Sequence, residues 1–294
     1  VRRVNRAGPL ASILSSAMLL AAVPASAQIM LSGEWNARYH EDEPERIPGP
    51  ELGDYLGLPV TEGARLFADA WDASRLTIPE HQCKVHASPY IYRGPLRVRI
   101  WEEKDLRTQQ VVAINQYLAT YEQSRTIWMD GRPHPPEYAP HTWMGFSTGR
   151  WVGDLLEVRT THIKSEWFRR NGIPNSDRTR LMEYFIRHGS VLTHVTIATD
   201  PAFLTEPLVK SEEYVNDNPS GRNWLWPCEY VEEVDRPRDD VPHFLPGRNP
   251  MLTEFAERHG IPFEATRGGA ETMYPEYRAR LAEMARAARA GAGK

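Results

Sequence analysis

The chain has 294 residues, of which 41% are hydrophobic, 25% charged and 10% aromatic, and its formal net charge is −4. Nine Trp, twelve Tyr and eight Phe provide ample apolar surface for burial, which excludes disorder as the main state. The 24 Pro follow no period, so collagen-like and coiled-coil classes are excluded, and the lack of a basic excess argues against nucleic-acid binding.

Residues 1–27 have the pattern of a secretory signal peptide. Three arginines lie within the first six residues, residues 10–23 form an uncharged apolar run, and Ala25-Ser26-Ala27 matches a cleavage site of small residues. This run is short for a bilayer crossing, and no other apolar run approaches about 20 residues. We expect a periplasmic or secreted protein without a membrane span that begins at Gln28. A membrane anchor or a core helix is the alternative.

Cys83 and Cys228 are the only cysteines in the sequence. In an oxidising compartment they are expected to form one disulfide that closes a long loop. In the entropic model such a bond adds roughly 3–5 kcal/mol to stability. Two unpaired buried thiols are the alternative. A metal site at these cysteines is not expected, because only His81 and His86 lie near Cys83 at ligand spacing.

The segment before the first predicted strands is irregular. Residues 28–60 are rich in Pro and Gly and predict an extended lead-in. Thr61 can cap a short helix that carries Ala64, Phe67 and Trp71 on one face.

From residue 96 onward, apolar and polar residues alternate, which is typical of strands with one buried face. The predicted strands are residues 96–101, 111–118, 121–129, 155–163, 178–187, 191–198 and 207–215. Short turns such as Gly153-Asp154 and His188-Gly189 separate them, which predicts an antiparallel meander that closes as a barrel or pairs as a sandwich. The sequence has neither an alternation of strands and helices nor a Gly-rich phosphate loop, so a nucleotide-binding α/β fold is not expected.

Residues 235–294 differ from the predicted barrel domain, residues 28–234. A Pro-rich arm over residues 236–250 is followed by a short helix, residues 252–259, and a longer one, residues 274–290. The longer helix carries a stripe of Tyr277, Leu281, Met284 and Ala288. We expect the stripe to pack on the barrel or on a second subunit, which would give a homodimer. A membrane-surface helix is the alternative.

Two sequence blocks carry a family resemblance. Residues 127–135 read IWMDGRPHP, and residues 143–154 read WMGFSTGRWVGD. Together with Glu183-Tyr184-Phe185 and Asp200-Pro201, they resemble a large family of secreted bacterial proteins, abundant in acidobacteria and proteobacteria and mostly uncharacterised. The resemblance covers roughly residues 75–235. It implies a fold and very little chemistry.

A second, shorter resemblance concerns the start of the predicted domain. Gly33-Glu34-Trp35 is similar to the Gly-x-Trp opening of lipocalin-like barrels. With the strand pattern, it makes the expected fold mainly β: an antiparallel, lipocalin-like (calycin-type) barrel with a short N-terminal helix and a helical C-terminal appendage. Such barrels enclose a cavity suited to one hydrophobic ligand.

Strand alternation also predicts which polar side chains point into this barrel. Polar residues share a face with apolar ones as follows: Arg125 with Tyr121 and Ile127, His162 with Leu156 and Val158, and Glu183 with Leu181 and Phe185. A buried charge needs a partner, so we expect Arg125 to pair with Glu183, which leaves His162 near a cavity. A core polar network is the alternative interpretation.

The loop between the predicted strands 121–129 and 155–163 carries two more histidines. His134 and His141 lie among four prolines, so the loop is stiff enough to cover a barrel mouth, and histidine is the natural acid–base group near neutral pH. A metal site from His134, His141, His162 and Glu183 is conceivable, but the usual ligand spacings are missing. Residues 145–149 spell G-x-S-x-G without the strand–turn–helix setting of a nucleophile elbow.

These observations predict an enzyme that uses acid–base chemistry, without a cofactor or metal, on a small hydrophobic or aromatic molecule inside the barrel. A lyase, an isomerase or a hydrolase would fit. The expected catalytic residues are His141, His134, His162 and Glu183, and the expected substrate-binding residues are Arg125, Arg132, Trp143, Trp128, Tyr117 and Trp167. The alternatives are a non-catalytic periplasmic carrier of a hydrophobic molecule and a structural envelope protein that docks a partner through its C-terminal helix.

Overall fold

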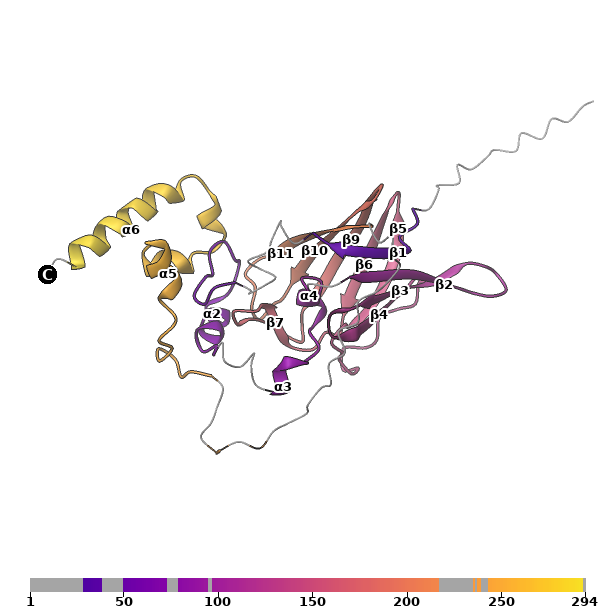
Figure 1. The fold of residues 1–294 in the computed structure, drawn as a ribbon, viewed down its shortest axis with the longest axis horizontal. Coiled ribbons are helices and arrows are strands. Elements are labelled where there is room, and N and C mark those ends of the chain that lie inside the picture. Colours follow the sequence, from indigo (N-terminus) through magenta and orange to yellow (C-terminus); the bar gives the residue numbers. More distant parts are fainter. Residues whose placement is uncertain are drawn as a thin grey trace, which may run out of the picture.

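Nine strands close into a barrel in the computed structural model, which describes residues 29–38, 50–72, 79–94, 97–216, 235, 237–238 and 243–292 (Figure 1). In chain order the barrel strands are β1 (Gly33–Ala37), β2 (Val98–Lys104), β3 (Val111–Leu118), β4 (Gln123–Trp128), β5 (Phe146–Val152), β6 (Leu155–Thr161), β9 (Arg180–His188), β10 (Val191–Thr199) and β11 (Leu208–Val215). Around the barrel the order is β1-β11-β10-β9-β6-β5-β4-β3-β2. The prediction of a mainly β barrel is therefore confirmed.

One pair of barrel strands departs from the expected antiparallel arrangement. β4 and β5 are parallel, with Ile127 opposite Ser147 and Trp128 opposite Thr148. The loop over residues 129–145 causes this, because it carries the chain back along the barrel before β5 begins. Gly149 permits the close approach of the two strands, since a Cβ there would lie 2.7 Å from the sulfur of Met129 and 2.8 Å from Cγ2 of Ile127. The meander prediction is wrong at this pair, and the barrel is mixed.

A small hairpin lies outside the barrel sheet. It consists of β7 (Glu166–Arg169) and β8 (Ile173–Asn175), which pair with each other and not with the barrel. Alternation did not predict β1, β5, β7 or β8 as strands, because these segments are short or, like β5, interrupted by glycine. All residues of β7 and β8 are buried, a pattern that shows no alternation.

The predicted first helix exists, and two of the three residues predicted for its buried face, Ala64 and Trp71, are buried. α2 (Glu62–Asp69) is capped by Thr61, whose hydroxyl oxygen accepts a hydrogen bond from the backbone N–H of Ala64 at 3.2 Å. Ala64 and Ala68 are buried, whereas Phe67 is 54% exposed. The small alanines let the helix pack closely on β8, and this close packing turns Phe67 outward. Two further short helices follow, α3 (Pro79–Gln82) and α4 (Ser88–Ile91).

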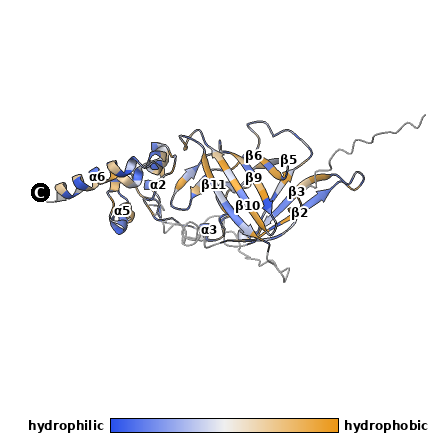
Figure 2. Ribbon diagram, turned by 90° about the horizontal axis from the view of Figure 1, so that it is seen from above, coloured by the Kyte–Doolittle hydropathy of each residue, from blue (hydrophilic) through white to orange (hydrophobic). Residues whose placement is uncertain are grey.

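The barrel core comes from the inward-facing residues of alternating positions on its strands. Figure 2 shows hydrophobic and hydrophilic residues interleaved along these strands. The fully buried apolar side chains of this cluster include Trp35, Ile100, Ile114, Ile127, Leu156 and Phe185. A second cluster joins α2 and the β7–β8 hairpin to one end of the barrel; it includes Tyr55, Ala64, Phe168, Ile173 and Leu181. This second cluster fixes the barrel end at which the candidate site lies.

The C-terminal segment forms the expected helical appendage. It contains α5 (Glu254–His259), two 3-10 turns (Phe263–Arg267 and Ala270–Met273) and α6 (Tyr277–Ala292). The segment docks on the lead-in and α2: Arg267 forms two hydrogen bonds of 2.9–3.0 Å with Asp69, and the N–H of Tyr55 donates to the carbonyl of Thr266. In α6 Tyr277 is buried, whereas Leu281 and Met284 are partly buried. The homodimer stays a prediction.

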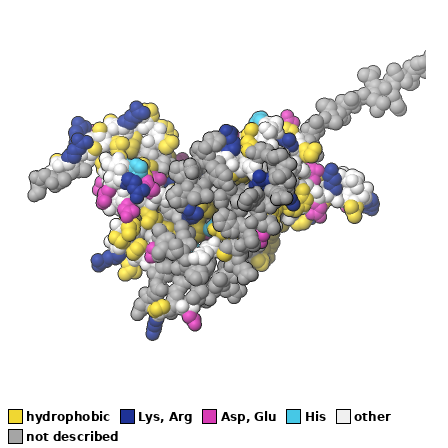
Figure 3. Space-filling model, viewed as in Figure 1, with side chains coloured by type: hydrophobic (Ala, Val, Ile, Leu, Met, Phe, Trp, Pro, Cys, Tyr) yellow, Lys and Arg dark blue, Asp and Glu magenta, His cyan; other side chains and the backbone are white. Residues whose placement is uncertain are grey.

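Figure 3 shows lysine or arginine and hydrophobic side chains together on the arm that carries α6. No helix within the described ranges has both the length and the apolar character that crossing a membrane demands. Two predictions fall on residues outside the description. These are the signal peptide, residues 1–27, and Cys228, the expected partner of Cys83.

Candidate functional site

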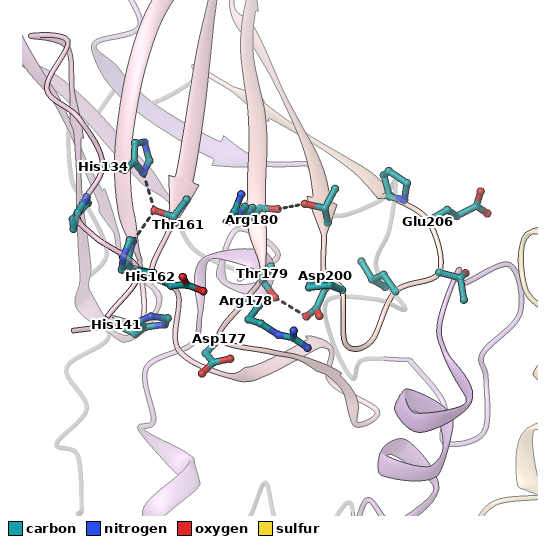
Figure 4. A pocket seen from close by; sticks show the side chains of 17 residues that line it. His134, His141, Thr161, His162, Asp177, Arg178, Thr179, Arg180, Asp200 and Glu206 are labelled. Carbon is teal, nitrogen blue, oxygen red and sulfur yellow. Dashed lines mark hydrogen bonds between the residues drawn. The ribbon is translucent and has the colours of Figure 1, made fainter. Parts of the chain in front are cut away.

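A cleft of about 910 Å³ opens at the end of the barrel where β6 and β10 stop and β9 and β11 begin (Figure 4). Thr161, Arg180 and Thr199, from three neighbouring strands, contribute to its floor. The proline-rich loop over residues 134–141 forms one wall, and residues 200–207 form another. The cleft lies at the rim and outer face of the sheet, so it is distinct from the barrel interior.

Three of the four predicted catalytic residues line this cleft. His134 and His141 come from the proline-rich loop, and His162 comes from the residue after β6. Figure 4 shows the three rings along one side of the cleft, with Arg178 and Arg180 at the start of β9 and Asp200 just after β10. The rings of His141 and His162 are 5.2 Å apart between centroids and lie nearly edge to face. The sequence-predicted histidines therefore converge on a single site.

His162 does not point into the barrel as alternation predicted. Its φ is 59°, a left-handed conformation that is uncommon for residues other than glycine. This conformation ends the period-two pattern of β6 and turns the imidazole to the rim. Ile163, the next residue, takes the buried position instead, with no exposed surface. Backbone strain of this kind is found preferentially at functional sites.

Hydrogen bonds tie His134 and His162 to each other through one hydroxyl. The Thr161 hydroxyl oxygen lies 2.7 Å from Nδ1 of His134 and 2.7 Å from Nδ1 of His162. Nε2 of His162 lies 2.9 Å from the carbonyl of Pro136, and Nε2 of His134 lies 2.9 Å from the hydroxyl of Thr148. Both nitrogens of both rings are thus engaged.

The carbonyl of Pro136 fixes the direction of this chain, because a carbonyl can only accept. With both rings neutral, Nε2–H of His162 donates to that carbonyl, so its Nδ1 accepts from the Thr161 hydroxyl. The same hydroxyl oxygen then accepts from Nδ1–H of His134, whose Nε2 accepts from Thr148. One arrangement of protons satisfies every member, and it leaves neither ring with an unused basic nitrogen.

His141 differs from the other two histidines. Its Nδ1 lies 3.1 Å from the carbonyl of Ile163, so in the neutral ring Nδ1 carries the proton. Nε2 is then the basic nitrogen, and it makes no hydrogen bond with any residue in the described part of the chain. A half-buried imidazole held by one nitrogen, with the other unused in a cleft, is the arrangement of a general base.

The charged residues around the histidines are of both signs. Arg178 and Arg180 line the cleft together with Glu137, Asp177, Asp200 and Glu206. Partial burial lowers the pKa of His134, and the neighbouring His162, Arg159 and Arg180 lower it further. His134 is therefore neutral at neutral pH, as the hydrogen-bond chain requires.

The fourth predicted catalytic residue, Glu183, lies inside the barrel and not in the cleft. It pairs with Arg125 through hydrogen bonds of 2.9 Å and 2.5 Å, as alternation predicted for these two residues. Its other contacts are Nε2 of His194 at 3.1 Å and the hydroxyl of Thr160, which donates to it at 2.8 Å. Burial alone would raise the pKa of Glu183, but Arg125 and His194 hold it well below its usual range.

This interior cluster extends to a second glutamate. Nδ1 of His194 lies 3.3 Å from Glu212, and the ring of His194 stacks on Phe185 with centroids 4.3 Å apart. Arg125, Glu183, His194 and Glu212 are at most 4% exposed. Their side chains occupy the interior that the sequence-based hypothesis assigned to a hydrophobic ligand. For Arg125 and Glu183, the structure therefore agrees with the alternative interpretation, in which these side chains form a polar network in the core.

The predicted substrate-binding residues are not among those that line the cleft. Arg125 is interior. Arg132 pairs with Asp130 and stacks over the ring of Trp128, with its guanidinium carbon 3.5 Å from the centroid. The remaining three lie elsewhere: Trp143 packs between Lys84 and Lys164, Trp167 is buried against Trp71 and His86, and Tyr117 lies on β3 beside Glu122.

Sequence reasoning missed Arg178, Arg180 and the loop over residues 200–207 as parts of the site. Alternation does place Arg180 on the face opposite Leu181, so the sequence predicts that the side chain of Arg180 points outward. Its neighbours were not predictable, because β9 pairs directly with β6 in the barrel although residues 162–179, which include the β7–β8 hairpin, separate the two strands in the sequence.

Within the described ranges, no three His, Cys, Asp or Glu side chains are grouped so that they could hold a metal ion. Comparison of the chain with protein-family models, with curated proteins and with solved structures gave no match.

Proposed function

We propose that this protein is an enzyme that performs acid–base chemistry on a small molecule bound in the cleft at the end of the barrel. The observation that carries the proposal is the unused Nε2 of His141. Its partner nitrogen is anchored to the carbonyl of Ile163 at 3.1 Å, which fixes both the tautomer and the orientation of the ring.

In this proposal Nε2 of His141 accepts a proton from the bound molecule or, in a hydrolase, from the water that attacks it, and then returns this proton to another atom of the molecule or to the leaving group. The carbonyl of Ile163 stabilises the imidazolium that forms, because it already accepts from Nδ1–H. Removal and return of one proton is the shared step of a lyase, an isomerase and a hydrolase. His134 and His162 hold the wall of the cleft in place through Thr161, and we assign them a positioning role.

The test uses the mature protein and its His141→Gln variant with a mixed pool of small metabolites, followed by mass spectrometry. We expect one compound to be consumed by the wild type and its turnover to fall about 10²- to 10⁴-fold in the variant. The mass difference between substrate and product identifies a lyase or a hydrolase, and a product of unchanged mass with a different chromatographic retention time identifies an isomerase. His188→Gln is the matched control, because His188 is an exposed histidine at the end of β9, outside the cleft.

Turnover in His141→Gln equal to that of the wild type, with both proteins folded, would refute the proposal. Retention of a compound that never changes would favour the non-catalytic periplasmic carrier instead. In that outcome the three histidines shape the cleft without moving a proton.

We further propose that the barrel is of the lipocalin-like, calycin type. In support, Gly33 opens β1 and the next inward residue, Trp35, has no exposed surface. Its indole N–H donates to the carbonyl of Leu31 at 2.8 Å, and the guanidinium of Arg187 lies 5.3 Å from its ring centroid. The parallel β4–β5 pair departs from that type. Export to the periplasm or beyond and membership of the family of secreted bacterial proteins stay part of the proposal.

A further inference from the structure

Two arginines on the border of the cleft form no ion pair with any residue that the structure describes. Arg178 and Arg180 flank the start of β9, and Arg180 lies opposite Thr199 of β10. Both side chains are exposed and line the cleft. Among the described residues, no carboxylate forms an ion pair with either guanidinium. Each therefore keeps its hydrogen-bond donors available for a ligand.

The contrast with other arginines of the chain is clear. Arg125 pairs with Glu183 at 2.5 Å, Arg267 with Asp69 at 2.9 Å, and Arg169 with Asp54 at 3.2 Å. At the cleft a carboxylate is present in Asp200, yet it forms no such pair.

The reason lies in the hydrogen bonds that Asp200 already accepts. The backbone N–H groups of Ser176, Ala202 and Phe203 donate to it at 2.6–3.1 Å, and the hydroxyls of Ser176 and Thr179 donate at 2.9 Å and 2.7 Å. These five bonds occupy both carboxylate oxygens and tie the loop at the end of β10 to the start of β9. Asp200 therefore holds the wall of the cleft in place, and its charge does not pair with Arg178 or Arg180.

Burial lowers the pKa of His134 most, and Arg180 is among the groups that lower it further. The positive charge of Arg180 therefore acts at the histidine side of the cleft. The exposed acids Glu137, Asp177 and Glu206 also line the cleft, so a molecule with many negative charges would be repelled.

Building on the proposed function, we propose that the substrate is a small molecule with a single oxyanion group, a carboxylate or a phosphate, which Arg178 and Arg180 bind. The planar guanidinium donates two parallel hydrogen bonds to such groups, which matches both chemistries. With the oxyanion at the arginines, the rest of the molecule extends toward the three histidines on the other side of the cleft and reaches Nε2 of His141 (Figure 4). The two arginines thus fill the anion-holding role that the sequence predicted for Arg125 or Arg132.

The experiment measures binding by isothermal titration calorimetry at constant ionic strength. The probes are inorganic phosphate, succinate monomethyl ester as a monocarboxylate, and choline chloride as a cation of similar size. We expect saturable binding of at least one of the two anions to the wild type and none of choline. A better affinity for phosphate or for the carboxylate identifies which oxyanion the site prefers.

The variants are Arg180→Gln, Arg178→Gln and the double variant. Each charged hydrogen bond contributes about 1.5–3 kcal/mol, so we expect about 10- to 100-fold weaker anion binding in each single variant and more in the double variant. Arg107→Gln is the matched control, because Arg107 is exposed in the β2–β3 turn and its substitution removes the same charge. We expect its affinity to equal that of the wild type.

Anion binding that is equal in the wild type and the double variant would overturn the inference, and so would saturable binding of choline alone or of no probe. His141→Gln separates this inference from the proposed function. Anion binding that persists in that variant while turnover also persists rejects the general base and keeps the oxyanion site. Loss of turnover in His141→Gln for an uncharged substrate, with no anion binding, rejects the oxyanion site and keeps the general base.

Discussion

Two clusters of histidine, arginine and carboxylate side chains lie on opposite faces of the same strand. Thr160, near the end of β6, faces inward and bonds both Arg125 and Glu183, at 2.6 Å and 2.8 Å. Thr161, the next residue, faces outward and joins His134 to His162. Because successive side chains of a strand point to opposite faces, two consecutive residues of β6 belong to the structural network and to the candidate site, respectively.

The two clusters differ in how completely their charges are compensated. Inside the barrel, Arg125 and Glu183 satisfy each other, and His194 lies between Glu183 and Glu212. In the cleft, Asp200 is saturated by uncharged donors, while Arg178, Arg180 and Nε2 of His141 keep their capacity to bind. The same residue types serve stability where they pair with each other and serve binding where they do not.

The strongest test of this comparison is Arg125→Met. Removing the guanidinium leaves the buried carboxylate of Glu183 without its main partner, so we expect the free energy of unfolding to fall by about 3–5 kcal/mol in urea denaturation. The double variant Arg125→Met with Glu183→Leu should recover most of that loss, because neither charge then stays buried alone. A loss below about 1 kcal/mol in the single variant would show that the interior network is not the structural one.

A smaller effect is expected from pH. Burial lowers the pKa of His194, but Glu183 and Glu212 outweigh this and raise it above its ordinary value. The protonated ring therefore stabilises the fold fully below about pH 6.5, and this contribution is lost as pH rises through the folded pKa. Its partner behaves in the opposite way. Burial would raise the pKa of Glu212, but His194 lowers it to about 2, so its contribution is lost as pH falls toward that value.

The measurement is the free energy of unfolding as a function of pH. We expect a decline on the alkaline side of at most about 1.4 kcal/mol per pH unit from this one group. The variant His194→Gln should lack this alkaline decline, whereas His188→Gln should retain it. An identical alkaline slope in both variants would contradict the assignment.

The smallest expected effect separates the two threonines. Thr161→Val should cost about 1 kcal/mol or less, because water can replace the lost hydrogen bond at the rim, whereas Thr160→Val leaves buried partners unsatisfied at about 1–3 kcal/mol. Nitrogen chemical shifts of the imidazoles give a second readout. In the wild type they should report a proton on Nδ1 of His134 and on Nε2 of His162, and Thr161→Val should abolish this fixed pattern. Equal costs for both variants would remove the distinction between the two faces.

Much of the fold was predictable because alternation is a local signal. The strand Val111–Leu118 has the predicted bounds, and the facing of Arg125 and Glu183 follows directly from period two. The parallel pairing of β4 with β5 was not predictable, because it depends on the path of a long loop rather than on any residue pattern. Phe67 was misplaced because helical spacing does not reveal which part of an apolar helix face a neighbouring element covers.

The candidate site was predictable in part for the same reason. Histidine chemistry and the proline-rich loop pointed to His134 and His141, and the chain brings them beside His162. The left-handed backbone at His162, however, left no trace in the sequence. Arg178 and Arg180 could be assigned a face but not a neighbour, since strand alternation gives direction and not adjacency.

The pairing of β1 with β11 has a consequence for synthesis. Asn36 lies opposite Val215, so the barrel closes by pairing of its first strand with its last. Ribosomes add about 5–20 residues per second, so the edge of β1 waits roughly ten seconds or more for its partner. Over that interval the growing sheet offers unpaired backbone groups to any other chain. In a protein of this topology, a delay of the last strand therefore prolongs the exposure of these backbone groups.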